Sequence, residues 1–123
     1  MKIYANKGIY GEDTVYVLET LEDFDEYEKI QKKMDPDFIK KFNPNFYEFK
    51  ELFKMYVGKI WQDKNQLKYR LNGKPFYEEY KIISLEDDYS NMDWYWVVQN
   101  IDDDRDIKYV LGNSKDIEMG VDL

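Results

Sequence analysis

Carboxylates are the only abundant side chains in this sequence that suit acid–base or metal-binding chemistry. The 123 residues include 26 Asp and Glu but no His and no Cys. Without an imidazole or a thiol, the chain cannot form a Ser–His–Asp or Cys–His arrangement or use a histidine general base. Nearly every zinc, copper and haem site is excluded for the same reason. Any catalysis would therefore have to come from carboxylates.

Eleven of these carboxylates form three clusters, which we interpret as candidate partner-binding residues. The clusters are Glu22, Asp23, Asp25 and Glu26, then Glu86, Asp87 and Asp88, then Asp102, Asp103, Asp104 and Asp106. A surface that carried them would repel nucleic acid and attract basic proteins, because the summed field steers association by sign. Carboxylates spaced like phosphates could also occupy the groove of a nucleic-acid-binding protein. The sequence leaves open whether the clusters converge on one face.

Two acidic stretches have a second interpretation as catalytic or metal sites. Residues 102–106 are rich in oxygen ligands, but the EF-hand calcium loop also needs a glycine in mid-loop and a distant glutamate, and both are lacking. Glu78 and Glu79 could suggest the carboxylate pair of a glycosidase, yet neighbouring residues of a strand point to opposite faces. No two of the six glycines have the spacing of a phosphate-binding loop. We therefore predict no enzymatic activity, no catalytic residue, no metal and no cofactor.

Charge is segregated along the chain, which raises a rival interpretation. The net charge is −6 over residues 1–28, +6 over residues 29–81 and −8 over residues 82–123. The basic middle interleaves lysines with aromatic residues, a pattern that suits single-stranded nucleic acid. Against it stand the overall charge of −8 and the presence of only two arginines, the residue best suited to bidentate phosphate contact. The alternative is thus a nucleic-acid-binding accessory protein that uses residues 29–81.

The elements that must position these residues follow from periodicity and turn signals. Thr20 suits a helix N-cap, Asp35-Pro36 ends that helix, and Asn72-Gly73 favours a hairpin turn. We expect strands over residues 2–5, 14–18, 67–71, 80–85, 94–101 and 107–111, helices over 20–35, 36–42 and 44–63, an acidic loop over 86–93, and a loosely held tail over 112–123 that docks through Ile117 and Val121. The order ββ-α(α)α-ββββ predicts an α+β fold, an antiparallel sheet with two or three helices packed on one face.

Length and composition set the remaining bounds. At 123 residues the chain suits a single domain over residues 1–123. The longest uncharged apolar run, residues 94–98, is far shorter than the ~20 residues that a membrane span needs. No secretory signal opens the chain and no cysteine can form a disulfide, so we expect a cytoplasmic protein without a membrane partner.

These features predict a small acidic, non-enzymatic protein that binds and inhibits a basic, nucleic-acid-processing protein such as a nuclease. By analogy of charge and size alone, small acidic proteins of phages and mobile elements that block restriction enzymes or CRISPR nucleases act in this manner. An immunity protein that neutralises a basic toxin would show the same physics. Both forms of the hypothesis stay open, and direct binding of nucleic acid is not expected.

Overall fold

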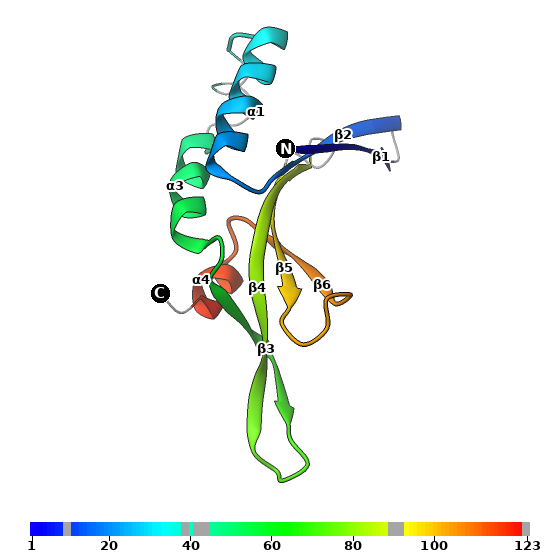
Figure 1. Ribbon diagram of the computed structural model, residues 1–123, viewed down its shortest axis with the longest axis vertical. Coiled ribbons are helices and arrows are strands. Elements are labelled where there is room, and N and C mark those ends of the chain that lie inside the picture. Colours follow the sequence, from blue (N-terminus) through cyan, green and yellow to red (C-terminus); the bar gives the residue numbers. More distant parts are fainter. Residues whose placement is uncertain (9–10, 38–39, 41–44, 89–92, 122–123) are drawn as a thin grey trace.

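The chain folds into an antiparallel β-sheet with helices on one of its faces (Figure 1). The computed structural model describes residues 1–8, 11–37, 40, 45–88 and 93–121, without the side chains of residues 6–8, 11–13, 88 and 93. In chain order the elements are β1 (Lys2–Gly8), β2 (Gly11–Leu18), α1 (Leu21–Met34), α3 (Phe46–Tyr56), β3 (Ile60–Tyr69), β4 (Pro75–Asp88), β5 (Asp93–Asn100), β6 (Ile107–Leu111) and α4 (Lys115–Gly120). The predicted α+β fold is confirmed, and the helix expected over residues 36–42 falls mostly outside the described residues.

The long strand β4 joins the two halves of the sheet. Its C-terminal part pairs with β2 on one side and β5 on the other, and its N-terminal part pairs with β3. The order is β1-β2-β4-β5-β6, with β3 beside β4 off this path. The distal parts of β3 and β4 extend away from the sheet as a two-stranded ribbon, residues 64–77, which we call the arm (Figure 1). Gly73, with a φ of 82°, lies in the connection at its tip, where the Asn72-Gly73 signal predicts a hairpin.

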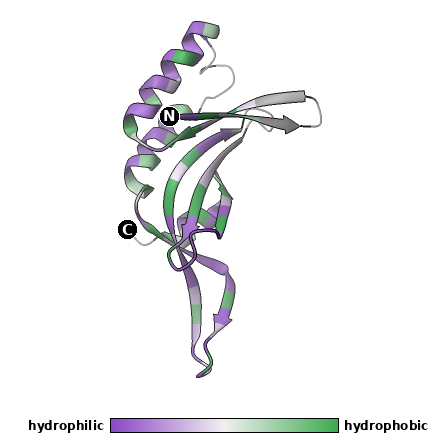
Figure 2. Ribbon diagram, turned by 45° about the vertical axis from the view of Figure 1, so that its right-hand side comes forward, coloured by the Kyte–Doolittle hydropathy of each residue, from purple (hydrophilic) through white to green (hydrophobic). Residues whose placement is uncertain are grey.

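Aromatic side chains build the core between the sheet and the helices. The buried rings are Phe24, Tyr27, Phe46, Phe49, Phe53 and Tyr56 from α1 and α3, and Tyr16, Trp61, Tyr80, Trp94 and Trp96 from the strands. Ring centroids of Phe24 and Phe53 lie 4.9 Å apart, and those of Tyr27 and Trp94 lie 5.5 Å apart. Large rings bury much apolar area per residue, which lets a chain with one alanine fill a core. Figure 2 shows α1 as mostly hydrophilic, with apolar residues recurring along it.

At the start of α1, a side-chain carboxylate and not solvent accepts the hydrogen bonds of the backbone N–H groups. The Asp23 carboxylate accepts hydrogen bonds from the backbone N–H of Glu19 at 2.7 Å and of Thr20 at 3.0 Å. The Met1 ammonium group also lies 3.1 Å from it. Burial alone would raise the pKa of Asp23, but these partners outweigh burial and the pKa lies below its ordinary value. The predicted N-cap at Thr20 is confirmed, and α1 ends before Asp35-Pro36 as expected.

The second long helix is shorter than the sequence predicts. The apolar stripe continues at helical spacing through Val57 and Ile60, which favours a helix up to residue 63, but α3 ends at Tyr56. Gly58 adopts a φ of 85°, and its N–H donates to the Ile82 carbonyl at 2.9 Å. This reversal turns the chain into β3 instead of continuing the helix. None of the described helices is long and apolar enough to cross a membrane.

Two further predictions are wrong in the second half of the chain. The acidic stretch at residues 86–88 belongs to β4, because pairing with β2 and β5 continues to Asp88. Residues 115–120 form α4 and not a loose tail: Ile117 is buried, and the Trp61 indole N–H donates to the Asp116 carbonyl at 2.9 Å. The expected docking through Ile117 and Val121 is nevertheless found, since Val121 forms a bridge with Trp61.

Phe53 tests the assignment of α3 to the core. We expect Phe53→Ala to lower the free energy of unfolding by ~3–5 kcal/mol, because it removes a buried ring and leaves a cavity. Met55→Ala, on the exposed side of the same helix, should change it by only about 0.5 kcal/mol. Urea unfolding followed by tryptophan fluorescence measures both variants, and equal midpoints would contradict the assignment.

Gly120 tests the docking of α4. A Cβ atom at this position would lie 2.2 Å from the Trp61 indole nitrogen and 2.4 Å from the Gln62 carbonyl oxygen. Gly120→Ala should therefore destabilise the protein by about 1–3 kcal/mol through overpacking. Met119→Ala, exposed on the same helix, is the control and should stay close to wild type in thermal unfolding. A Gly120→Ala variant as stable as this control would mean that α4 does not pack on β3.

Candidate functional site

The three predicted acidic clusters do not converge on one surface. In the first, at the N-terminal end of α1, Asp23 is buried in the cap described above, whereas Glu22, Asp25 and Glu26 are exposed. The Asp25 carboxylate pairs with the Lys50 ammonium at 3.1 Å, and the Glu26 carboxylate lies 3.9 Å from the Met1 ammonium. This cluster therefore serves largely to fix the helix start and to tie α1 to α3.

The second cluster is divided between the two faces of the sheet. Glu86 and Asp87 are both buried strand residues of β4, and successive strand residues point to opposite faces. The Tyr4 hydroxyl donates to Glu86 at 3.0 Å, and the Tyr27 hydroxyl, on the helix side, donates to Asp87. The side chain of Asp88 lies outside the described residues. The prediction of a solvated acidic loop is wrong for residues 86–88, because strand pairing continues there and Glu86 and Asp87 are buried, and residues 89–92 of the predicted loop lie outside the described residues.

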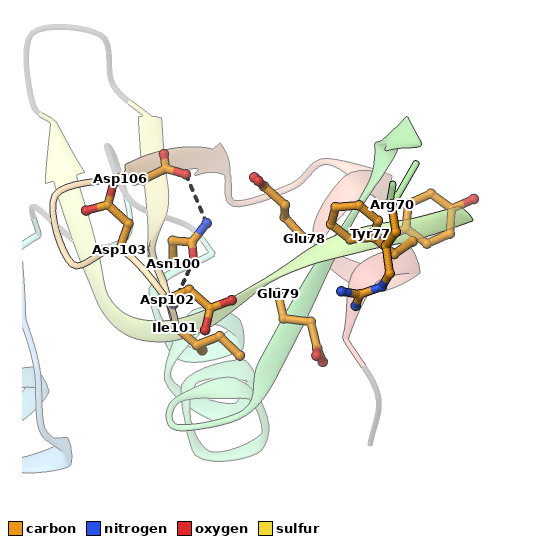
Figure 3. A pocket seen from close by; sticks show the side chains of 10 residues that line it. Arg70, Tyr77, Glu78, Glu79, Asn100, Ile101, Asp102, Asp103 and Asp106 are labelled. Carbon is orange, nitrogen blue, oxygen red and sulfur yellow. Dashed lines mark hydrogen bonds between the residues drawn. The ribbon is translucent and has the colours of Figure 1, made fainter. Parts of the chain in front are cut away.

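The third cluster meets two carboxylates from a distant part of the chain. Asp102, Asp103 and Asp106 lie in the turn between β5 and β6, and together with Glu78 and Glu79 of β4 they line a pocket of about 420 Å³ (Figure 3). We call it the acidic pocket; its remaining lining residues are Arg70, Phe76, Tyr77, Asn100 and Ile101. Glu78 and Glu79 point in different directions from β4, as the alternation of a strand requires (Figure 3). Asp104 is exposed in the same turn.

A buried tyrosine connects the two sides of the acidic pocket. The Tyr80 hydroxyl lies 2.9 Å from an Asp106 carboxylate oxygen and 3.1 Å from a Glu78 carboxylate oxygen. A hydroxyl has one proton, so it donates to one carboxylate at a time. The Asn100 side-chain amide also donates to Asp106, at 3.1 Å. These contacts fix the β5–β6 turn against β4 without cancelling the negative charge.

Both connected carboxylates stay ionised at neutral pH. The hydrogen bond from Tyr80, helped by that from Asn100, lowers the pKa of Asp106 below its ordinary value. The Lys68 ammonium, 2.8 Å from Glu78, lowers the pKa of Glu78 in the same way. Neither group is therefore poised to donate a proton, as a general acid must. Among the described residues no three carboxylates gather closely enough to hold a metal ion.

Ion pairs neutralise some lysines of the basic middle, including Lys68 of the arm, whose ammonium lies 2.8 Å from Glu78 of β4. Lys32, Lys50 and Lys54 pair with Glu28, Asp25 and Glu51 on α1 and α3. The arm carries Lys64, Lys68, Arg70 and Lys74 and no acid. Two of its cations lie over aromatic rings, since the Lys64 ammonium is 4.6 Å from the Tyr77 ring centroid and the Arg70 guanidinium is 4.6 Å from that of Phe76. Leu71, near the tip, is fully exposed.

Comparison with known proteins adds no family to this geometry. The chain matches no protein-family model, no curated protein and no solved structure. Functional inference therefore depends on the described residues themselves.

The pKa of Asp106 tests the tyrosine contact. Since the Tyr80 hydroxyl stabilises the ionised form of Asp106, Tyr80→Phe should raise the pKa of Asp106 toward its ordinary value of 3.8. The pKa of Glu78 should move less, because Lys68 is its principal partner. A carbon-detected NMR titration of the side-chain carboxyls measures both shifts, with the exposed Tyr69→Phe as control. An unchanged Asp106 pKa in Tyr80→Phe would contradict the contact.

Proposed function

We propose that this protein is a non-enzymatic binding protein that inhibits a basic, nucleic-acid-processing protein, and that the acidic pocket with the adjoining turn is its contact surface. The observation that carries the proposal is the meeting of five carboxylates around one pocket with Arg70 as the only cation among its lining residues. A partner with a groove made to bind phosphates presents the complementary charge.

The electrostatics of the acidic pocket favour steering of a charged partner. Within the described part of the chain, Glu79, Asp102 and Asp104 have no ion-pair partner, and Asp103 pairs only with the exposed Arg105 at 3.3 Å. Exposed ion pairs contribute little individually, so these groups act through their summed field. Such a field raises the association rate with an oppositely charged surface and repels nucleic acid.

The extent of the acidic surface narrows the form that inhibition takes. Because the first two clusters lie elsewhere, the acidic pocket combines the third cluster alone with Glu78 and Glu79, next to the arm. This arrangement suits a local block of a basic groove, either of a nuclease of the restriction or CRISPR type or of a basic toxin. We also propose that the protein acts in the cytoplasm, where it binds this same class of basic partner.

The arm favours a second candidate function. Its four cations and no acid, on a two-stranded ribbon, suit contact with nucleic acid, because a ribbon of this kind fits the major groove of DNA. The alternative of a nucleic-acid-binding accessory protein is thereby narrowed from residues 29–81 to residues 64–77. The acidic pocket at the base of the arm would repel a nucleic acid that extended beyond it.

Charge reversal separates the two candidate functions. The triple variant Glu79→Lys, Asp102→Lys, Asp104→Lys should lose the basic proteins that wild type captures from a host lysate, and should associate with the purified partner about tenfold more slowly at 0.1 M salt. The quadruple variant Lys64→Glu, Lys68→Glu, Arg70→Glu, Lys74→Glu should still capture these basic proteins from the lysate. Mass spectrometry identifies the captured proteins, and biolayer interferometry measures the association rates.

A matched control and a gel shift complete this test. Glu22→Lys, Glu26→Lys, Glu48→Lys changes the net charge equally at exposed sites away from the acidic pocket and should behave like wild type. If this control loses the partner as the pocket variant does, the acidic pocket is not the contact surface. Micromolar binding of wild type to single- or double-stranded DNA at low salt, lost in the arm variant, would replace the inhibitor proposal with the nucleic-acid-binding one.

A further inference from the structure

A second pocket lies on the face of the sheet that the helices leave uncovered, since none of its lining residues belongs to the core between sheet and helices. It has a volume of about 250 Å³, and its aliphatic lining is formed by Val17, Ile83, Val97 and Ile107 from β2, β4, β5 and β6. The pairing of β4 with β5 shifts register between Ile82 and Ser84, which is the pattern of a β-bulge. This irregularity lets the neighbours Ile83 and Ser84 both line the same pocket.

Two carboxylates, Glu19 and Glu86, line this pocket, and Glu86 is the buried one. Glu86 lines it, is only 9% exposed, and accepts a hydrogen bond from the Tyr4 hydroxyl at 3.0 Å. The other charged lining residues, Lys2 and Glu19, pair with each other at 3.4 Å. The formal net charge of the lining residues is therefore −1.

Two accessible tyrosine rings flank the carboxylate. Tyr4 on β1 is 43% exposed and Tyr109 on β6 is 58% exposed, and both line the pocket. Burial and the charge of Glu86 raise the pKa of the Tyr109 hydroxyl, in agreement with the proximity of the two side chains. Aromatic faces beside a carboxylate attract a cation, because the ring quadrupole adds to the charge.

We infer that this pocket, which we call the Glu86 pocket, receives a lysine or arginine side chain of the partner. The inference rests on the proposed function, since it assigns the anchor by which a basic partner would be held. The methylene groups of such a side chain would cover the valine and isoleucine surface, and its charged end would meet Glu86 between the two tyrosine rings. A nucleic acid does not suit this pocket, because its phosphates would lie against a carboxylate of like charge. A purely apolar segment does not suit it either, because it would remove water from the carboxylate without supplying a hydrogen-bond donor in its place.

Amino-acid analogues test the Glu86 pocket without any partner. We expect N-acetyl-arginine methylamide to shift the backbone amide signals of Glu86, Val97 and Tyr109 in ¹⁵N-labelled protein, with a Kd of roughly 1–10 mM. The neutral isostere N-acetyl-citrulline methylamide should bind about tenfold more weakly, because it lacks the charge. Glu86→Gln keeps the shape and an acceptor for Tyr4, and should weaken the arginine analogue by about tenfold.

Matched variants distinguish this pocket from a general charge effect. Asp104→Asn removes the same charge from the β5–β6 turn and should leave the affinity within about twofold of wild type, whereas Tyr109→Leu should weaken it about threefold or more through loss of the ring. A wild-type-like amide spectrum confirms that each variant is folded.

Three results would overturn the inference. They are equal binding of the citrulline analogue, unchanged binding in Glu86→Gln, and shifts confined to the acidic pocket. Failure of the proposed function would appear in the lysate and association experiments instead, where charge reversal at the acidic pocket would have no effect.

Discussion

Antiparallel pairing of β4 with three other strands is the constraint on which the rest of the structure depends. Its 14 residues pair with β3 near the start and with both β2 and β5 near the end. Tyr80 and Ile82 enter the aromatic core, and Glu86 faces the uncovered side. β4 contributes residues 76–79 to the acidic pocket and Ile83, Ser84 and Glu86 to the Glu86 pocket.

Tyrosine hydroxyls satisfy several carboxylates of this acidic chain. Glu86, Asp87 and Asp106 each accept a hydrogen bond from a tyrosine hydroxyl, donated by Tyr4, Tyr27 and Tyr80 respectively. A hydroxyl satisfies a carboxylate oxygen as a neutral donor, whereas a lysine would also cancel the charge. Three of the 12 tyrosines therefore have a structural role as hydrogen-bond donors to carboxylates.

The sequence allows prediction of elements whose signals are local. Thr20 and Asp35-Pro36 bound α1 correctly, and the Asn72-Gly73 signal and the apolar run at residues 94–98 identify the arm tip and β5. The end of α3 is missed because the apolar stripe keeps its helical period past Gly58, whose positive φ only the fold reveals. The acidic pocket is missed because Glu78 and Asp106 meet through Tyr80, a contact between elements far apart in the chain.

The cationic arm lies beside the acidic pocket, and this juxtaposition of opposite charges restricts which partners can bind. The arm, with four cations, adjoins the acidic pocket, whose own lining holds five carboxylates and Arg70. A basic surface that enters the pocket is therefore repelled wherever it extends along the arm. Like-charge contact of this kind suppresses wrong partners and fixes orientation more than it adds affinity. A uniformly basic protein fits poorly, whereas one whose basic groove borders an acidic or neutral rim can satisfy the pocket and the arm together.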